Sequence, residues 1–263
     1  MYKRQGIQLG TINGAILSDG VINTVNPMPM TEMGNVPFLI KSCEAYYDML
    51  DDFYADVVNE ESKKRGFVNV AYYLAGGVDV GNIKRPISTP EDLVGLKIRT
   101  WDAQGPLTFL STLKAVPITM AFGEVYTSLQ QGAIDGVITS DFQFNAQKFT
   151  DIVKYHTQFH VFYNYQNLTF GAKWFDSLPK DVQSAFIEAG NRSQKYCREV
   201  ITPAFAESTY KDMEKAGVKV TYLTDEQKQV FADAVSGTWP KFRERIGAEI
   251  FDEVAAYMEA WKE

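Results

Sequence analysis

The sequence predicts an α/β fold, and residues 95–140 indicate it most clearly. Short apolar or β-branched segments in this region alternate with segments that have helical spacing. Strands that alternate with helices in this way form a parallel sheet with helices on both faces. The expected strands are residues 96–100, 116–120 and 134–139, and the expected helices contain residues 106–113 and 124–131.

Local signals support the boundaries of these helices. Pro106 stands in a first helical turn, where its missing N–H is not needed. Leu107 and Leu110 then lie on one helical face. Gly132 is expected to end the second helix, because glycine adopts the left-handed conformation of a helix C-cap at little cost.

Two polar residues lie where ligands bind in folds of this class. Arg99 and Thr139 each stand at the carboxyl end of an expected strand, and ligands of open α/β sheets bind outside those ends. The guanidinium group of Arg99 presents donors that match a carboxylate bidentately. One hypothesis is that Arg99 holds a substrate carboxylate. The alternative is that Arg99 closes an internal salt bridge, and sequence position favours neither.

Three segments of the chain carry a resemblance to a known family: TPEDLVGLKIR (residues 89–99), PITMAFGEVYTSLQQGAIDG (117–136) and QKFTDIVKY (147–155). They resemble the DctP-type solute-binding proteins of TRAP (tripartite ATP-independent periplasmic) transporters. The resemblance extends along almost the whole chain. It implies a two-lobed periplasmic-binding-protein-like fold with mixed, mostly parallel sheets, a long crossing strand and a long supporting helix. It also implies that Arg99 holds the ligand carboxylate.

The resemblance implies a receptor rather than an enzyme. Such a receptor captures a small organic acid in the periplasm and delivers it to the membrane permease subunits of a TRAP transporter. Capture is expected to involve hinge closure, in which ligand contacts stabilise the closed state. No cofactor and no metal are implied, and the receptor is expected to be a monomer.

The chain departs from the family pattern at two places. Val78, Asp79 and Val80 stand where many members have a second basic residue. Thr139 occupies the position of a ligand-contacting asparagine, so a hydrogen-bonding group is kept but the amide is lost. These departures predict a different second anchor and leave the identity of the acid open, whereas carboxylate binding by Arg99 is still expected.

The resemblance and local features together predict how the chain divides between the lobes. Gly76 and Gly77 form a candidate hinge, residues 163–170 form an alternating strand that crosses between the lobes, and Pro203 is expected to bend the long helix. Asn164 lies at this crossing and is a candidate ligand contact. The expected division is residues 1–76 and 165–204 for lobe I and residues 77–164 and 205–263 for lobe II.

The start of the chain predicts that lobe I is incomplete. Residues 1–5 show no pattern and match nothing in the family. Residues 6–20 resemble the segment in which a helix end leads into a strand. Family members carry a signal peptide, a strand, a helix and a second strand before this point. An N-terminally truncated member without a signal peptide is therefore expected, with an exposed sheet edge.

Five further residues are candidate ligand contacts. The resemblance favours Tyr73, because family members have an aromatic residue near the ligand there; core packing is the alternative. Ser18 and Asp19 follow an expected strand, although a helix cap or turn suits Asp19 better. Trp101 and Phe142 follow strand ends, where they would form either apolar walls of a cleft or ordinary core.

Composition and motifs restrict the classes of function. A net charge of −7 argues against a nucleic-acid partner, and no apolar run approaches the length of a membrane span. Cys43 and Cys197 have no metal-binding spacing, so two thiols are expected and one disulfide is the alternative. His156 and His160 are four residues apart, but their surroundings are typical of a strand, which disfavours a metal site.

The alternative function is an α/β enzyme that acts on a small carboxylate. The chain contains no G-x-S-x-G elbow, no P-loop, no G-x-G-x-x-G after a strand and no H-E-x-x-H motif. The sequence therefore favours a binding protein that has no catalytic residues.

Overall fold

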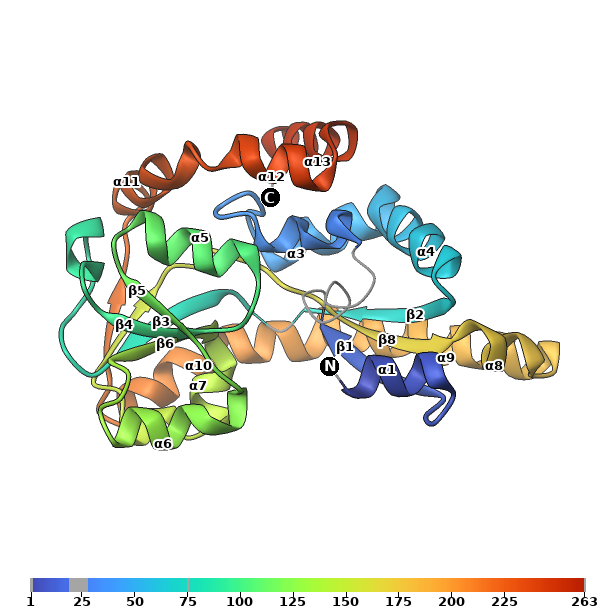
Figure 1. Ribbon diagram of the computed structural model, residues 1–263, viewed down its shortest axis with the longest axis horizontal. Coiled ribbons are helices and arrows are strands. Elements are labelled where there is room, and N and C mark those ends of the chain that lie inside the picture. Colours follow the sequence, from blue (N-terminus) through green and yellow to red (C-terminus); the bar gives the residue numbers. More distant parts are fainter. Residues whose placement is uncertain (1, 19–27, 75, 263) are drawn as a thin grey trace.

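The computed structural model describes residues 2–18, 28–74 and 76–262. The strands of these residues form two separate sheets. Figure 1 shows the two sheets beside each other along the long axis of the molecule, each with its own helices. The fold is therefore α/β with two lobes, as the sequence predicts.

The first lobe contains a three-stranded sheet in the order β1-β8-β2 among the described residues. Its strands are β1 (Gly14–Ser18), β2 (Phe67–Tyr73) and β8 (Gln166–Gly171). Strand β8 runs antiparallel to both neighbours. The expectation of mostly parallel strands is wrong for this sheet, because β2 runs toward one crossing between the lobes and β8 returns from another.

The second lobe contains a six-stranded sheet in the order β5-β4-β6-β3-β7-β9. Its strands are β3 (Val78–Asn82), β4 (Lys97–Thr100), β5 (Val116–Thr119), β6 (Gly136–Ser140), β7 (Tyr155–Gln158) and β9 (Lys219–Tyr222). β4 is parallel to β5 and β6, and β7 is parallel to β9, whereas β3 is antiparallel to β6 and β7. Apart from β3, the strands of this described sheet run the same way, which confirms a mixed, mostly parallel sheet here.

The helices beside β4 and β6 begin and end close to the predicted positions. Pro106 lies in the first turn of α5 (Gln104–Thr112). Gly132 follows α6 (Val125–Gln130), and its φ of 70° confirms the left-handed cap. The other short helices of this lobe are η3 (Pro90–Leu93), η4 (Phe122–Glu124), α7 (Asp141–Ala146), η5 (Phe149–Asp151) and α11 (Asp225–Ser236).

Helix α1 (Tyr2–Leu9) packs on the first sheet, although the sequence of residues 1–5 shows no pattern. Arg4 and Ile7 are buried, because residues three apart lie on one helical face. The other helices of this lobe are η1 (Pro29–Asn35), α3 (Cys43–Met49), η2 (Leu50–Tyr54), α4 (Ala55–Lys64) and α8 (Ala172–Ser177).

A long helical segment joins the two lobes. It consists of α9 (Lys180–Tyr196), the π-helical turn η6 (Cys197–Ile201) and α10 (Thr202–Lys215). Pro203 lies in the first turn of α10, next to the π-helical turn. In Figure 1, α9 lies beneath the first sheet and α10 beneath the second. The predicted supporting helix is present, and its irregular turn lies where the proline removes a backbone donor.

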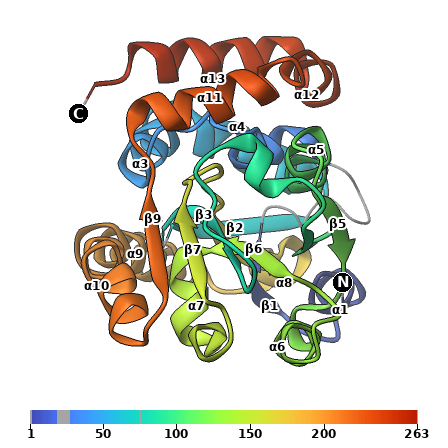
Figure 2. The same ribbon diagram turned by 90° about the vertical axis from the view of Figure 1, so that its left-hand side faces the viewer.

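The C-terminal helices α12 (Trp239–Ile246) and α13 (Ala248–Ala260) extend from the second lobe back over the first. Figure 2 shows them above α3 and α4. Their buried side chains, including Phe242 and Val254, belong to the same apolar cluster as Tyr46 of α3. The packing of α12 and α13 thus differs from the expectation that residues 205–263 belong wholly to lobe II. The exact lobe boundaries stay a prediction.

Each lobe has its own apolar core. One cluster surrounds Tyr46 and Tyr165 in the first lobe, and another surrounds Ile98 and Phe109 in the second. Cys43 and Cys197 are both free thiols, which confirms that prediction. Among the described residues, no helix combines the length and apolar character that crossing a membrane requires.

Candidate ligand-binding site

Arg99 lies in β4, one residue before the strand ends, and only 4% of it is exposed. Its Nη2 donates to the carbonyl oxygen of Met120 at 3.0 Å, and its Nε is 3.3 Å from the same oxygen. The guanidinium carbon lies 5.1 Å from the centre of the Phe122 ring. The loop after β5 therefore orients the guanidinium group with a peptide carbonyl and an aromatic face.

No carboxylate among the described residues pairs with Arg99. Burial alone lowers its pKa to about 10, with no contribution from a neighbouring charge. The group is nevertheless protonated at neutral pH. A buried cation without an anionic partner is unfavourable, and an added carboxylate would relieve that cost. Within the described part of the chain, the internal salt bridge is absent, which leaves the hypothesis of a ligand carboxylate.

Thr139 lies on the neighbouring strand β6, near the same edge of the sheet. Arg99 pairs with Val137 of β6 in the parallel register, and Thr139 lies two residues further along that strand. Thr139 is 7% exposed, and its hydroxyl makes no hydrogen bond within the described residues. Its side chain is thus an unused donor and acceptor close to the end of the sheet that carries Arg99.

The edge of the sheet that carries Arg99 faces the first lobe. The chain enters β3 from the first lobe through Gly76 and Gly77, and it leaves β7 toward β8 through residues 159–165. The amino end of β3 and the carboxyl ends of β4, β6 and β7 lie at the same edge. A ligand held by Arg99 would therefore lie between the two lobes.

Two other predicted residues lie near the path between the lobes. The ring of Trp101 contacts Phe162 edge-on, with 6.4 Å between ring centres. Asn164 is half-buried in the segment that leads to β8, and its Oδ1 is a buried acceptor without a partner in the described residues. Both side chains remain candidates, Trp101 as an apolar wall and Asn164 as a hydrogen-bonding group.

Two aromatic candidates have structural contacts instead. The Tyr73 hydroxyl lies 2.8 Å from Oγ of Ser193, so this side chain joins β2 to α9. The ring of Phe142 stacks on Phe205 of α10, with ring centres 5.2 Å apart. For both residues the structure matches the packing alternative. The half-buried Ser18 ends β1 opposite Gln166, and Asp19 lies outside the described residues.

Sequence reasoning missed a buried polar cluster at the same edge of the sheet. Asp79 is fully buried and accepts hydrogen bonds from the backbone N–H groups of Phe159 and His160 at 2.9 and 2.8 Å. The Tyr210 hydroxyl donates to Oδ2 of Asp79 at 2.7 Å. The acidic residue that replaces the family's basic position was a signal, but its partners are distant in the sequence.

Three side chains of this cluster are of types that bind metal ions, but hydrogen bonds within the cluster already engage their polar atoms. Ligand atoms of Asp79, Asp141 and His160 lie within 4.8 Å of one another. The Tyr210 hydroxyl lies 2.7 Å from Nε2 of His160 and 3.3 Å from Oδ2 of Asp141, in addition to its bond to Asp79. The tyrosine therefore bridges the three groups without an ion.

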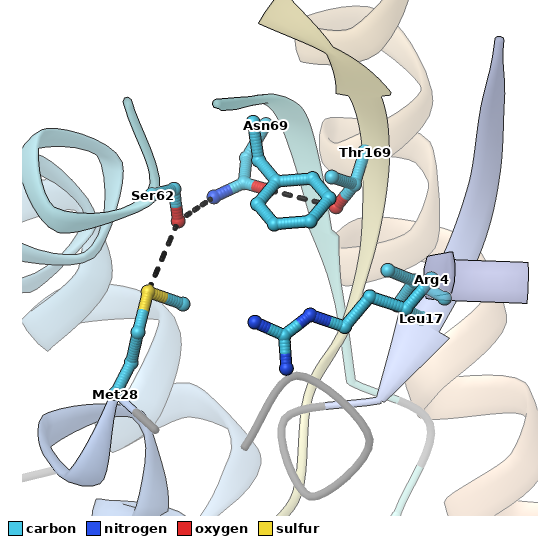
Figure 3. Close-up of a pocket in the computed structure, with 7 residues that line it drawn as sticks. Arg4, Leu17, Met28, Ser62, Asn69 and Thr169 are labelled. Carbon is cyan, nitrogen blue, oxygen red and sulfur yellow. Dashed lines mark hydrogen bonds between the residues drawn. The ribbon is translucent and has the colours of Figure 1, made fainter. Parts of the chain in front are cut away.

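A separate pocket lies in the first lobe (Figure 3). Asn69 donates to Ser62 at 2.9 Å, and its Oδ1 accepts from Thr169 at 2.7 Å. The Arg4 guanidinium lies 5.4 Å from the centre of the Phe67 ring. Burial, followed by the nearby charge of Arg65, lowers the pKa of Arg4. Sequence analysis missed this pocket because it set residues 1–5 aside.

The two-lobed α/β fold, with a buried arginine at the edge that faces the other lobe, defines a solute-binding protein of the periplasmic type. More particularly, the chain belongs to the DctP family, the bacterial extracellular solute-binding proteins of family 7, which residues 3–245 match. The recognition of a TRAP transporter solute-binding protein is thereby confirmed.

Named proteins of similar sequence support membership of this family. The chain is 30% identical over 233 residues to the 2,3-diketo-L-gulonate-binding periplasmic protein YiaO of Escherichia coli, covering 88% of this chain and 69% of that protein. It is 26% identical to the C4-dicarboxylate-binding periplasmic protein DctP of Rhodobacter capsulatus, covering 86% of this chain and 67% of the relative. The chain thus spans about two thirds of these relatives, and the predicted truncation stays a prediction.

Solved structures of TRAP periplasmic solute-binding proteins have the same fold. One from Ochrobactrum anthropi is 27% identical, with a TM-score of 0.88 over 98% of this chain and 80% of that chain. Another, from a Sulfitobacter species, is 25% identical with a TM-score of 0.88 over 97% of this chain and 83% of that chain, and contains bound β-D-galacturonate.

Proposed function

We propose that this chain is the receptor of a TRAP transporter and that it captures a small organic acid through Arg99. The observation that supports this most is the buried guanidinium group, which a peptide carbonyl orients and no described carboxylate neutralises. A carboxylate in this place would form charge-assisted, bidentate hydrogen bonds. Thr139, on the adjacent strand, would add a neutral hydrogen bond.

The charges at this edge favour an acid with one carboxylate. Arg99 is the described buried basic residue at this edge that no carboxylate neutralises, while Val78, Asp79 and Val80 stand where a second basic residue was expected from the family. A second ligand carboxylate would therefore lack a cationic partner. The relative named for 2,3-diketo-L-gulonate and the one crystallised with β-D-galacturonate support this class, an acid whose remaining groups are neutral and polar, whereas the relative named for C4-dicarboxylates has a ligand with two carboxylates.

The proposed transport role implies a cellular location and a protein partner. Relatives of the chain are named periplasmic binding proteins, which supports a periplasmic location. We also propose that the chain delivers its ligand to the membrane permease subunits, functions as a monomer and has no enzymatic activity. They rest on membership of a family of solute-binding receptors.

Ligand binding and turnover can be tested on the same purified chain. Thermal unfolding with β-D-galacturonate, D-galactonate or succinate should show a higher midpoint with the sugar acids, because a ligand stabilises the state that binds it. NMR spectra of the bound acid after prolonged incubation should show no product. Formation of product would support the alternative α/β enzyme, and stabilisation by succinate alone would contradict the single-carboxylate class.

A further inference from the structure

Three of the segments that connect the lobes meet at the buried Asp79 carboxylate. Asp79 follows the hinge glycines by two residues, on β3. Its Oδ1 accepts from the N–H groups of Phe159 and His160, in the segment that leads back to the first lobe. Its Oδ2 accepts from Tyr210 of α10 at 2.7 Å and lies 3.0 Å from Nε2 of His156. One carboxylate thus ties all three connections together on the second-lobe side.

His160 is held in an uncommon backbone conformation at this junction. Its φ is 49°, in the left-handed region that non-glycine residues seldom adopt. Its Nε2 lies 2.7 Å from the Tyr210 hydroxyl and 3.7 Å from Oδ2 of Asp141. Strained residues of this kind persist where surrounding contacts fix them, often at switch regions. Here the contacts are hydrogen bonds and charges.

The same side chains lie directly against the hinge glycines. A Cβ atom on Gly76 would be 2.1 Å from Oδ1 of Asp141, and one on Gly77 would be 2.3 Å from Cδ2 of His160. The N–H of Asp141 also donates to the Gly77 carbonyl oxygen at 2.9 Å. A rotation of the backbone at these glycines must therefore move past the Asp141 carboxylate and the His160 ring.

The charges around His160 favour its protonated form. Burial alone would lower the pKa of His160, but the carboxylates of Asp79 and Asp141 outweigh it and raise the pKa above its usual 6.5, while Lys228 opposes them. Burial raises the pKa of Asp141. The titratable and charged groups that face His160 from the surrounding elements are Asp79, Asp141, Tyr163, Tyr210 and Lys228.

We propose that His160 is a proton-controlled clamp on the hinge, which fixes the relative orientation of the lobes when it is charged and loosens it when it is neutral. The protonated imidazole balances the two carboxylates that lie against it. When the proton is lost, the Asp141 and Asp79 carboxylates face each other across the Tyr210 hydroxyl without a cation between them. The contacts of the His160 ring with Asp141 and Tyr210 then weaken, while the backbone hydrogen bonds of Val78 with residues 161 and 162 remain.

The sign of the pH effect follows from the raised pKa. The stabilisation by charged His160 is fully present below about pH 6.5, the usual value for the unfolded chain, and is lost as the pH rises through the higher folded value. The clamp should therefore hold in mildly acidic solution and release as the pH rises above the raised pKa of His160.

The histidine content makes a direct test simple. The chain has 2 histidines, so the imidazole NMR signals of unliganded protein report His156 and His160 separately once a His160→Gln variant assigns them. Residual dipolar couplings of the backbone amides, measured over the same pH range, report the orientation of one lobe relative to the other. The use of unliganded protein keeps the result independent of whether Arg99 holds the ligand.

We expect His160 to titrate above pH 6.5 and the interlobe orientation to change with the same midpoint. His160→Gln should abolish that pH dependence, whereas Lys211→Gln, which removes an exposed charge on the same helix as Tyr210, should retain it. The proposal is overturned if the interlobe couplings stay constant while His160 titrates, or if His160 titrates at or below pH 6.5. If His160→Gln does not fold, NOE contacts with the Tyr163 ring, whose centre lies 5.6 Å from that of the imidazole, assign the His160 signal in the parent chain, which then decides between these outcomes.

Discussion

Nη2 of Arg99 donates to the carbonyl oxygen of Met120 at 3.0 Å, and this bond orients a buried cation whose charge is not balanced by any described carboxylate. Arg99 lies on β4, and Met120 follows β5, the parallel neighbour of that strand. The guanidinium group is thus in place before a ligand arrives. Such preorganisation reduces the entropy that binding must overcome.

Thr139 should make a smaller contribution to binding than Arg99. Thr139→Ala removes one neutral hydroxyl, so we expect affinity for the bound acid to fall by about 1 kcal/mol, roughly fivefold. Isothermal titration calorimetry measures the change. Thr127→Ala, at an exposed position on α6, is the matched control and should leave affinity unchanged. Equal affinity for Thr139→Ala and parent would remove Thr139 from the site.

Gly76→Ala should destabilise the chain. Gly76 has a φ of 146°, and a Cβ there would be 2.1 Å from the Asp141 carboxylate, so both backbone strain and a steric clash are expected. We expect a loss of about 2 kcal/mol or more in the free energy of unfolding, measured with urea. Gly237→Ala is the control, because nothing lies within 4 Å of its Cβ position. Equal losses for the two variants would argue against a crowded hinge.

Arg198 should stabilise the packing of the long helix on the first lobe. It forms ion pairs with Glu44, Asp48 and Asp51, all on the helices that precede β2. Arg198→Met should lower the free energy of unfolding by about 1 kcal/mol at low salt and by less at high salt, since these pairs are partly exposed.

The control for this ion-pair cluster is Arg192→Met, an exposed position on α9. It should change stability little at either salt concentration. If Arg198→Met lowers the free energy of unfolding equally at low and high salt, Arg198 stabilises the fold mainly through packing, such as the contact of its guanidinium group with the Tyr47 ring.

Asp79 should make stability sensitive to acid. Burial alone would raise its pKa, but the two histidines and the backbone donor of His160 outweigh it and lower the pKa to about 2. The native state thus binds fewer protons than the unfolded chain, in which the usual value is 3.8. This contribution, roughly 2 kcal/mol, is present above pH 3.8 and is lost as the pH falls toward 2.

Asp79→Asn should be less stable at neutral pH and should lose less further stability on acidification than the parent. Urea unfolding at several pH values between 6 and 3 measures both effects. Asp102→Asn, at an exposed position, is the control and should follow the parent. A variant that loses stability on acidification as steeply as the parent would show that other carboxylates cause the acid sensitivity.

The sequence predicted local structure well where short-range signals act. The parallel pairing of β4 with β5 and β6 follows from the strand–helix alternation, and the left-handed Gly132 follows α6, as its position at a helix end predicts. The antiparallel strand β3 could not be read from periodicity, because its partners are set by the chain crossings between the lobes. The return of α12 and α13 to the first lobe is likewise a long-range packing result.

The candidate site was predictable only in part. Arg99 was found because its strand-end position and its family segment agree. The cluster of Asp79, Asp141, His160 and Tyr210 was missed, since its members come from β3, α7, the segment after β7 and α10 and share no local pattern. Tyr73 was selected by resemblance, but the pairing of its hydroxyl with Ser193 depends on how α9 packs on β2.

The most direct test of the account is the affinity of Arg99 variants for the sugar acid that stabilises the parent chain, measured by isothermal titration calorimetry. Arg99→Ala should weaken binding by roughly 2–5 kcal/mol, because the ligand carboxylate would be left buried without its partner. Arg99→Lys should weaken binding by less, since it keeps the charge but loses the planar fork. Arg192→Ala should bind as the parent does. If Arg99→Ala binds the acid as tightly as the parent, the carboxylate is held elsewhere and the proposed site is wrong.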